Sequence, residues 1–297
     1  MKILLTGGSG TVGEKVLERL CANKEFDITA FDVKNKRTQK FYKPYRNSIK
    51  IRYGDLSNKE DVLPICEDVE FLIHLAAIIP PLADENPNLA SKVNVIGTQN
   101  LISSLETRSK GAFFLYASSV SVYGDRMENP LIRVGDPLLP SEGDEYAKTK
   151  IKAEQLVRES KLDWSIFRLT AIMGIDNHKV SGLMFHMPLL TPMEIATPTD
   201  TARAFVNAVA RKKFLTQRIF NLGGGSECRI TFQEFLSRSF LISGLGQLDF
   251  PGHVFAEKNF HCGYYADGDE LEGILNFRKD TIESYFEGIE NAVSPFR

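Results

Sequence analysis

The stretch that decides the fold of this sequence is Thr6-Gly7-Gly8-Ser9-Gly10-Thr11-Val12-Gly13. It follows the apolar run Ile3-Leu4-Leu5 and precedes a helical pattern, so a strand, a glycine turn and a helix follow one another. Gly7 permits the tight turn out of the strand, Gly10 lets backbone approach a pyrophosphate, and Gly13 lets the helix pack close to the sheet. The N-terminus of the helix offers N–H groups to an anion. This order predicts a dinucleotide site, and a simple chain reversal is the alternative.

The composition limits the kind of protein and of partner. The 297 residues, 43% of them hydrophobic, suit one large domain or a core domain with a smaller lobe. With 36 Lys and Arg against 38 Asp and Glu, the chain has no electrostatic footprint for nucleic acid or an anionic membrane. Its four cysteines show no C-x-x-C spacing, and no apolar run approaches the length of a membrane span. We therefore expect a cytoplasmic, unsecreted protein without nucleic-acid or membrane partners.

Short apolar runs alternate with helical patterns along the chain. This alternation predicts a Rossmann-type α/β fold, a doubly wound parallel sheet with right-handed crossovers. Two amphipathic helices are expected at Leu89–Leu105 and Glu145–Ser160, and together they would form the face of a homodimer. The expected strands are Ile3–Thr6, Asp27–Asp32, Ile49–Tyr53, Phe71–Ala76, Ala112–Ser118, Trp164–Leu169 and Arg218–Leu222.

The pattern loosens after Gly174. Asp176–Pro198 is rich in proline, histidine and methionine and is interpreted as loop and lid rather than sheet. We therefore expect a dinucleotide-binding core at residues 1–170 and a small substrate lobe at 171–297, with Arg218–Leu222 returning to the core sheet.

Asp32 closes the second predicted strand, 25 residues beyond Gly7. An acidic side chain there accepts hydrogen bonds from both hydroxyls of an adenosine ribose and repels a 2′-phosphate, which favours NAD over NADP. Lys34, Lys36 and Arg37 lie close in sequence and leave NADP as the weaker alternative. Asp55 follows the third strand and is expected either at the adenine end of the cofactor or as a helix cap.

Tyr146 and Lys150 form the second chemical element. Spaced i and i+4, they share a helix face, and we expect the ammonium to lower the pKa of the phenol so that Tyr146 acts as acid or base. Ser118 and Ser119 end an apolar strand at the carboxyl edge of the sheet, where α/β folds bind ligands. A hydroxyl there can hold a substrate hydroxyl or carbonyl. An ordinary solvated helix pair is the alternative for Tyr146 and Lys150.

With these motifs in this order, the chain resembles the extended short-chain dehydrogenase/reductase family, in particular its NAD-dependent sugar epimerase/dehydratase group. The resemblance spans most of the chain. Its motifs are Thr6-Gly7-x-x-Gly10-x-x-Gly13, Asp32, Gly54-Asp55-Leu56, His74-Leu75-Ala76-Ala77, Asn94 with Gly97-Thr98, Ser118 to Gly124, Tyr146-x-x-x-Lys150, Phe167-Arg168, Asp200 to Ala204 and Phe220 to Gly223.

The resemblance implies roles for individual residues. Ser119, Tyr146 and Lys150 match the catalytic residues, and the implied chemistry is hydride transfer between a substrate carbinol carbon and the nicotinamide. His74 is expected in a hydrogen-bond network at a strand end, and no metal site is expected. The implied cofactor-binding residues are Gly7, Gly10, Thr11, Val12, Asp32, Asp55, Leu56, Leu75, Ala76, Ala77, Asn94, Tyr146 and Lys150, and the expected substrate-binding residues are Ser119, Ser121, His178 and Arg229.

The sequence also departs from the group. Ser119-Val120-Ser121 stands where its dehydratases typically have Thr-Asp-Glu, so dehydration is disfavoured. The short stretch between Gly174 and Asp200 favours a smaller pocket than a full nucleotide-sugar lobe. Three hypotheses follow: an NAD-dependent epimerase of a sugar or nucleotide-sugar, an NAD(P)-dependent dehydrogenase or reductase of a smaller compound, and a non-catalytic dinucleotide-binding protein.

Overall fold

The computed structural model describes residues 1–175, 182–258 and 260–293, and the chain divides into two compact units. The first unit contains residues 1–119, 143–168 and 202–220, and the second contains 120–142, 169–201 and 221–297. Each unit is described by itself. The functional division predicted at residue 170 remains a prediction.

The first unit is built on a seven-stranded sheet in the order β10-β7-β5-β4-β1-β2-β3. Neighbouring strands from β5 to β3 pair in parallel, and every predicted strand is present within two residues of its expected bounds. The doubly wound Rossmann-type fold is thereby confirmed. The strands are β1 (Lys2–Thr6), β2 (Asp27–Asp32), β3 (Lys50–Tyr53), β4 (Phe71–His74), β5 (Phe113–Ser119), β7 (Asp163–Leu169) and β10 (Arg218–Leu222).

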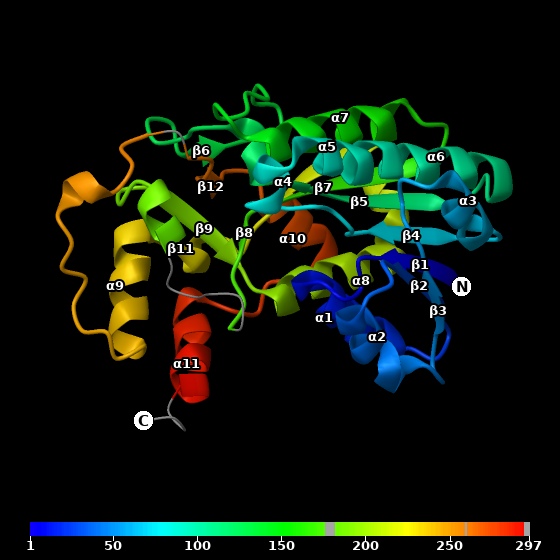
Figure 1. Ribbon diagram of the computed structural model, residues 1–297, viewed down its shortest axis with the longest axis horizontal. Coiled ribbons are helices and arrows are strands. Elements are labelled where there is room, and N and C mark those ends of the chain that lie inside the picture. The colour runs from blue at the N-terminus through cyan, green and yellow to red at the C-terminus, as the bar shows by residue number, and fades with distance from the viewer. Residues whose placement is uncertain (176–181, 259, 294–297) are drawn as a thin grey trace. The chain divides into compact units, whose positions relative to one another are not determined.

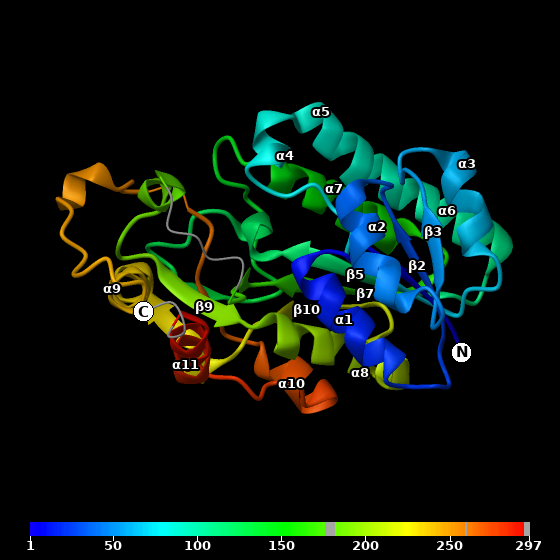
Figure 2. The ribbon, with the colours of Figure 1, turned by 60° about the horizontal axis from the view of Figure 1, so that its bottom comes forward.

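Helices cover both faces of this sheet. Figures 1 and 2 show α5 (Pro87–Ala90), α6 (Gly97–Arg108) and α7 (Glu145–Glu159) on one face and α1 (Thr11–Cys21), α2 (Lys36–Tyr42) and α8 (Pro198–Leu215) on the other. Helices on both faces explain why the central strands β1, β4 and β5 are buried along nearly their whole length. Shorter helices connect these elements, namely η1 (Lys43–Tyr45), α3 (Lys59–Val62), η2 (Leu63–Cys66) and α4 (Leu82–Glu85).

The predicted helix at Leu89–Leu105 is continuous through three segments. Between α5 and α6 the turn widens into a π-helix, η3 (Ser91–Ile96), of the kind often found at functional sites. Helix α6 packs beside α7, as the sequence pattern requires for one shared face. Dimerisation through this face remains a prediction.

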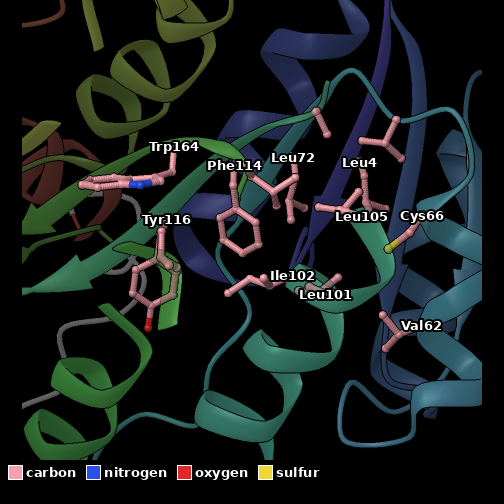
Figure 3. Packing of buried hydrophobic residues seen from close by; sticks show 14 of the residues in the cluster. Leu4, Val62, Cys66, Leu72, Leu101, Ile102, Leu105, Phe114, Tyr116 and Trp164 are labelled. Carbon is pink, nitrogen blue, oxygen red and sulfur yellow. The ribbon is translucent and has the colours of Figure 1, made fainter. Parts of the chain in front are cut away.

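One part of the hydrophobic core of the first unit lies between the sheet and α6. Leu4, Leu72 and Phe114 come from neighbouring strands and point towards Leu101 and Leu105 of α6, all of them fully buried (Figure 3). Burial of each such side chain contributes roughly 2 kcal/mol. This packing fixes the sheet, and so fixes the turns that leave its carboxyl ends.

The second unit has its own small sheets and core. Strand β9 (Pro192–Ala196) pairs with β8 (Ala171–Ile172) and β11 (Arg229–Thr231), and β6 (Leu131–Ile132) pairs with β12 (Tyr264–Tyr265). The interpretation of Asp176–Pro198 as loop rather than sheet is therefore wrong at β9, which is buried along its whole length. Its proline stands at the first residue, where a strand tolerates it. The helices of this unit are η4 (Val120–Tyr123), η5 (Gly182–His186), η6 (Ser226–Cys228), α9 (Phe232–Ile242), η7 (Gly252–Val254), α10 (Asp269–Leu275) and α11 (Ile282–Val293).

Candidate functional site

A cavity of about 220 Å³ opens in the first unit at the carboxyl ends of β1, β2 and β4. Strands β1 and β4 are neighbours in the sheet although the chain passes through β2 and β3 between them, so the strand order reverses here. Ligands of open α/β sheets bind at this reversal. The cavity is lined by Gly7, Ser9, Gly10, Phe31, Asp32, Val33, Gly54, Asp55, Leu56, Leu75, Ala76, Ala77, Ile78 and Val93.

The glycine loop is shaped by close backbone approaches. Gly7 has φ +73°, and a Cβ there would lie 2.6 Å from the backbone nitrogen of Ala76. A Cβ on Gly13 would lie 2.1 Å from the carbonyl oxygen of Gly7, so α1 packs against the loop only with glycine at this position. Gly10 precedes α1 without a capping side chain, which leaves N–H groups of the first turn for a ligand. Thr11 and Val12 begin α1 and do not line the cavity.

Asp32 presents its carboxylate to this cavity. Its Oδ2 accepts hydrogen bonds from the backbone nitrogen of Ser9 at 3.2 Å, the Ser9 hydroxyl at 2.6 Å and the Tyr42 hydroxyl at 3.1 Å. Its Oδ1 accepts from the nitrogen of Val33 at 2.9 Å. The carboxylate therefore has a defined position at the end of β2.

Asp55 and Leu56 line the same cavity after β3. The Oδ1 atom of Asp55 accepts from the nitrogen of Ser57 at 2.8 Å, which closes a tight local turn. Asn58, and not Asp55, caps the following helix α3. The capping alternative for Asp55 is therefore wrong, and its contact with the adenine end remains a prediction.

Asn94 lies within the π-helix, and its side chain is hydrogen-bonded to the backbone of Ile78, which lines the cavity. Its Oδ1 accepts from the nitrogen of Ile78 at 2.8 Å, and its Nδ2 donates to the Ile78 oxygen at 2.9 Å and to the Thr149 hydroxyl at 2.9 Å. These bonds tie the segment after β4 to helix α7. The side chain is 1% exposed and does not line the cavity, so its binding role remains a prediction.

Ser119, Tyr146 and Lys150 come together within the first unit. Ser119 ends β5, and its side chain is hydrogen-bonded to that of Tyr146 on α7. One turn further along α7, the Nζ of Lys150 lies 5.5 Å from the centroid of the Tyr146 ring. The Asp144 carboxylate caps α7 by accepting from the nitrogen of Ala147 at 2.7 Å, which fixes where the helix begins.

Burial shifts the pKa of Tyr146 in the direction opposite to the one expected from the sequence. Desolvation raises the pKa of Tyr146 above its ordinary value, and the hydrogen bond with Ser119 lowers it in part. Desolvation lowers the pKa of Lys150 to about 7, against a smaller opposite effect of Glu154. The expected lowering of the phenol pKa is therefore wrong for the protein without cofactor, because burial outweighs the effect of the groups around the phenol.

Behind these residues lies a buried ion pair. The guanidinium of Arg168 donates to both carboxylate oxygens of Glu154, at 2.9 and 2.7 Å, and the Ser118 hydroxyl donates to Glu154 at 2.5 Å. All three residues are at most 2% exposed. This network joins β5, α7 and β7, so Ser118 serves the frame of the site. His74 bonds Thr6 and Thr98, which confirms its expected network at a strand end.

Two of the remaining predicted substrate residues lie in the second unit. Ser121 and Arg229 belong to the second unit, and His178 falls outside the described residues. Ser121 is fully buried, and Arg229 bonds the buried carboxylate of Glu194 at 3.1 Å and the oxygen of Tyr265 at 2.9 Å. Their substrate-binding roles remain predictions.

Several residues of the site were missed in the sequence. Ser9 and Gly54 stand inside motifs that were recognised, and their spacing was available as a signal. Tyr42 carries no motif, because its contact with Asp32 depends on where α2 ends. Among residues 1–175, 182–258 and 260–293, no cluster of His, Cys, Asp or Glu could hold a metal ion. In the same ranges, no helix combines the length and apolarity that crossing a bilayer requires.

Comparison with known proteins identifies a family that matches this chain. Residues 4–166 match the sequence model of the 3-beta hydroxysteroid dehydrogenase/isomerase family. The sterol-4-alpha-carboxylate 3-dehydrogenase, decarboxylating, of Homo sapiens is 30% identical over 203 residues, which are 67% of this chain and 49% of that protein. The D-erythronate dehydrogenase of Cupriavidus necator is 24% identical over 265 residues, or 80% of this chain and 82% of that protein. The chain thus spans about half the length of the human relative.

Solved structures show the same fold. The UDP-glucuronic acid 4-epimerase of Bacillus cereus, in complex with UDP-glucuronic acid and NAD, superposes with a TM-score of 0.81 over 100% of both chains. At 17% identity this likeness concerns the fold alone.

Proposed function

Because the chain belongs to the 3-beta hydroxysteroid dehydrogenase/isomerase family, we propose that it oxidises a secondary alcohol to a ketone with NAD, using Tyr146 as the acid/base. The observation that carries the proposal is the hydrogen bond between Ser119 and Tyr146, with Lys150 one turn away on the same helix. These groups and the cavity belong to the same unit of the chain.

The residues of the cavity fit NAD. Gly7 and Gly13 leave space where any Cβ would meet backbone, and the first turn of α1 offers N–H groups to the pyrophosphate. Asp32 would accept the hydroxyls of the adenosine ribose, and Asp55 and Leu56 would lie at the adenine. Bound NAD supplies the acceptor for the hydride that leaves the substrate carbon.

The chain supplies the proton transfer. As the phenolate, Tyr146 would take the proton of the substrate hydroxyl while the C–H bond breaks and the hydride leaves, and as the phenol it would return that proton when the ketone is reduced. Ser119 holds the phenol by a hydrogen bond that lowers its pKa, opposing the effect of burial. The Nζ of Lys150, with a pKa of about 7, can hold or release a proton at neutral pH while it donates to the carbonyl oxygen of Ala117.

Net dehydrogenation is the outcome that we favour. The human relative and the Cupriavidus relative are both named as dehydrogenases, and their names identify substrates that carry a carboxylate, a sterol carboxylate and erythronate. We therefore propose a hydroxy acid as the substrate class. The epimerisation expected from the sequence is the second candidate, because oxidation to a ketone is also its first half-reaction.

The test is NADH formation by the purified chain with a panel of sugar acids, smaller hydroxy acids, sterol acids and nucleotide-sugars. Tyr146→Phe should abolish turnover while leaving NAD affinity within about twofold, whereas Tyr45→Phe, the same change away from the site, should leave both unchanged. Net NADH supports dehydrogenation. Conversion of a substrate to its epimer with tightly retained NAD supports the second candidate instead. A fully active Tyr146→Phe variant would contradict the mechanism.

A further inference from the structure

The carboxylate of Asp32 is held by neutral donors. Two backbone N–H groups, the Ser9 hydroxyl and the Tyr42 phenol donate to it, at distances between 2.6 and 3.2 Å. Hydrogen bonds from neutral groups orient a carboxylate without cancelling its charge. Asp32 is therefore fixed in position and remains a full negative charge facing the cavity.

Tyr42 is the donor that does not itself line the cavity. It is 1% exposed at the end of α2 and reaches Asp32 from the protein side, whereas Ser9, Asp32 and Val33 line the cavity. Its hydroxyl also lies over the glycine loop, where a Cβ on Gly8 would come within 2.6 Å of it. Tyr42 thus acts on a ligand only through Asp32 and the loop.

Helix α2 has little freedom to move Tyr42 away. Asn35 and Thr38 form a capping box at its start, and the Thr38 hydroxyl donates to the oxygen of Val33 at 2.7 Å. This bond ties the helix to the residue that directly follows Asp32. At the other end, the Tyr42 ring packs edge-on against Tyr53 of β3, with centroids 6.2 Å apart. Both ends of α2 are therefore held by contacts with residues at the ends of β2 and β3, next to the cavity.

We propose that Tyr42 is a positioning residue that sets the preference for NAD over NADP, by holding the charged Asp32 carboxylate where the 2′-position of the adenosine ribose lies. The inference rests on the cofactor placement proposed above. A fixed carboxylate accepts the ribose hydroxyl of NAD, and it repels the 2′-phosphate of NADP because it cannot turn aside. A mobile carboxylate would accept the ribose hydroxyl less well and would repel the 2′-phosphate less strongly.

The test is calorimetric titration of NAD and NADP into nucleotide-stripped protein, for the wild type, Tyr42→Phe, Asp32→Asn and the matched control Tyr45→Phe. Tyr45 follows in η1, is half-buried and undergoes the same loss of a hydroxyl. In Tyr42→Phe we expect NAD affinity to fall about fivefold while NADP affinity changes less than about twofold, so the ratio of the two affinities falls. Asp32→Asn should abolish most of the preference, and Tyr45→Phe should retain it.

The outcomes separate this inference from the proposed function. A ratio that falls in both Tyr42→Phe and Asp32→Asn supports the inference. If Asp32→Asn loses the preference but Tyr42→Phe keeps it, or weakens both nucleotides equally, Tyr42 is merely structural and the inference is overturned. If neither variant changes the ratio, the ribose does not lie at Asp32, and the cofactor placement falls together with the inference.

Discussion

The Nζ of Lys150 donates a 2.8 Å hydrogen bond to the carbonyl oxygen of Ala117, two residues before Ser119. This bond ties the middle of α7 to the end of β5, so it sets the position of Tyr146 relative to Ser119. It also places an amine that is 3% exposed where water cannot solvate its charge. We therefore expect replacement of Lys150 by an apolar residue to raise the stability of the protein and to abolish its activity.

Lys150→Met should stabilise the protein at neutral and lower pH. Burial lowers the pKa of Lys150 from 10.5 to about 7, so between these values the unfolded chain binds more protons than the native one, and wild-type stability rises with pH. Below about pH 7 the native state carries the buried charge at full cost, at most about 5 kcal/mol. The gain of the variant should therefore be largest below pH 7 and vanish towards pH 10.5.

Denaturant unfolding across this pH range measures the gain, with exposed Lys152→Met on the same helix as the control. Turnover of Lys150→Met should be lost while the control stays active. A gain in stability that does not depend on pH would contradict the lowered pKa of Lys150.

Ser119→Ala should shift the pH dependence of oxidation upwards. The hydrogen bond with Ser119 lowers the pKa of Tyr146, so its removal raises the pH at which the phenol loses its proton to become the base, and turnover near neutral pH should fall about 10²-fold. The pH profile of turnover measures the shift. Ser118→Ala is the matched control, because that hydroxyl bonds Glu154 instead of Tyr146. An equal shift in both variants would mean that the frame, and not the hydrogen bond, is responsible.

His74→Asn should make the protein less sensitive to acid. Burial lowers the pKa of His74 from 6.5 to about 3, so in this window the unfolded chain binds the additional proton and wild-type stability falls as the pH falls. The variant lacks this part of the slope, at most about 1.4 kcal/mol per pH unit. Urea unfolding at pH values between 7 and 4 measures the difference. Exposed His253→Asn should retain the wild-type slope, and a parallel loss there would refute the assignment.

Glu154→Gln should destabilise the protein by about 3–5 kcal/mol, because the buried charge of Arg168 then loses the carboxylate that neutralises it. Arg168→Met should cost a similar amount. The double variant should cost clearly less than the sum, with a coupling energy above about 2 kcal/mol in a double-mutant cycle measured by denaturant unfolding. Additive losses would show that the two side chains do not act as a pair.

The central sheet was predictable because local and global signals agree along it. The inner strands β1, β4 and β5 are mainly apolar, helical patterns separate the strands along the chain, and Gly7, Gly10 and Gly13 fix the first turn. The second unit was harder to predict. Strand β9 contains Pro192 and the charged Glu194, and only the partners of that carboxylate, which come from residues 225, 229 and 265, make a buried strand possible.

The site was predictable in its identities but less so in its electrostatics. Spacing alone placed Tyr146 and Lys150 on one face, yet the direction of the Tyr146 pKa shift depends on burial, which sequence spacing does not contain. Tyr42 was missed for a related reason. Its contact with Asp32 depends on the length of α2 and on the angle at which the helix returns to the sheet.

The first unit is assembled from three separated stretches of chain, and its sheet is complete only with β10, which ends at Leu222. During synthesis, β7 is complete once Leu169 has been added. The edge of β7 that will pair with β10 stays unpaired while residues 170–217 are being made. An unpaired strand edge is a template for aggregation. The nascent chain is therefore prone to aggregation until β10 has been made. A fragment ending near residue 170 would keep the edge of β7 unpaired and would stay prone to aggregation.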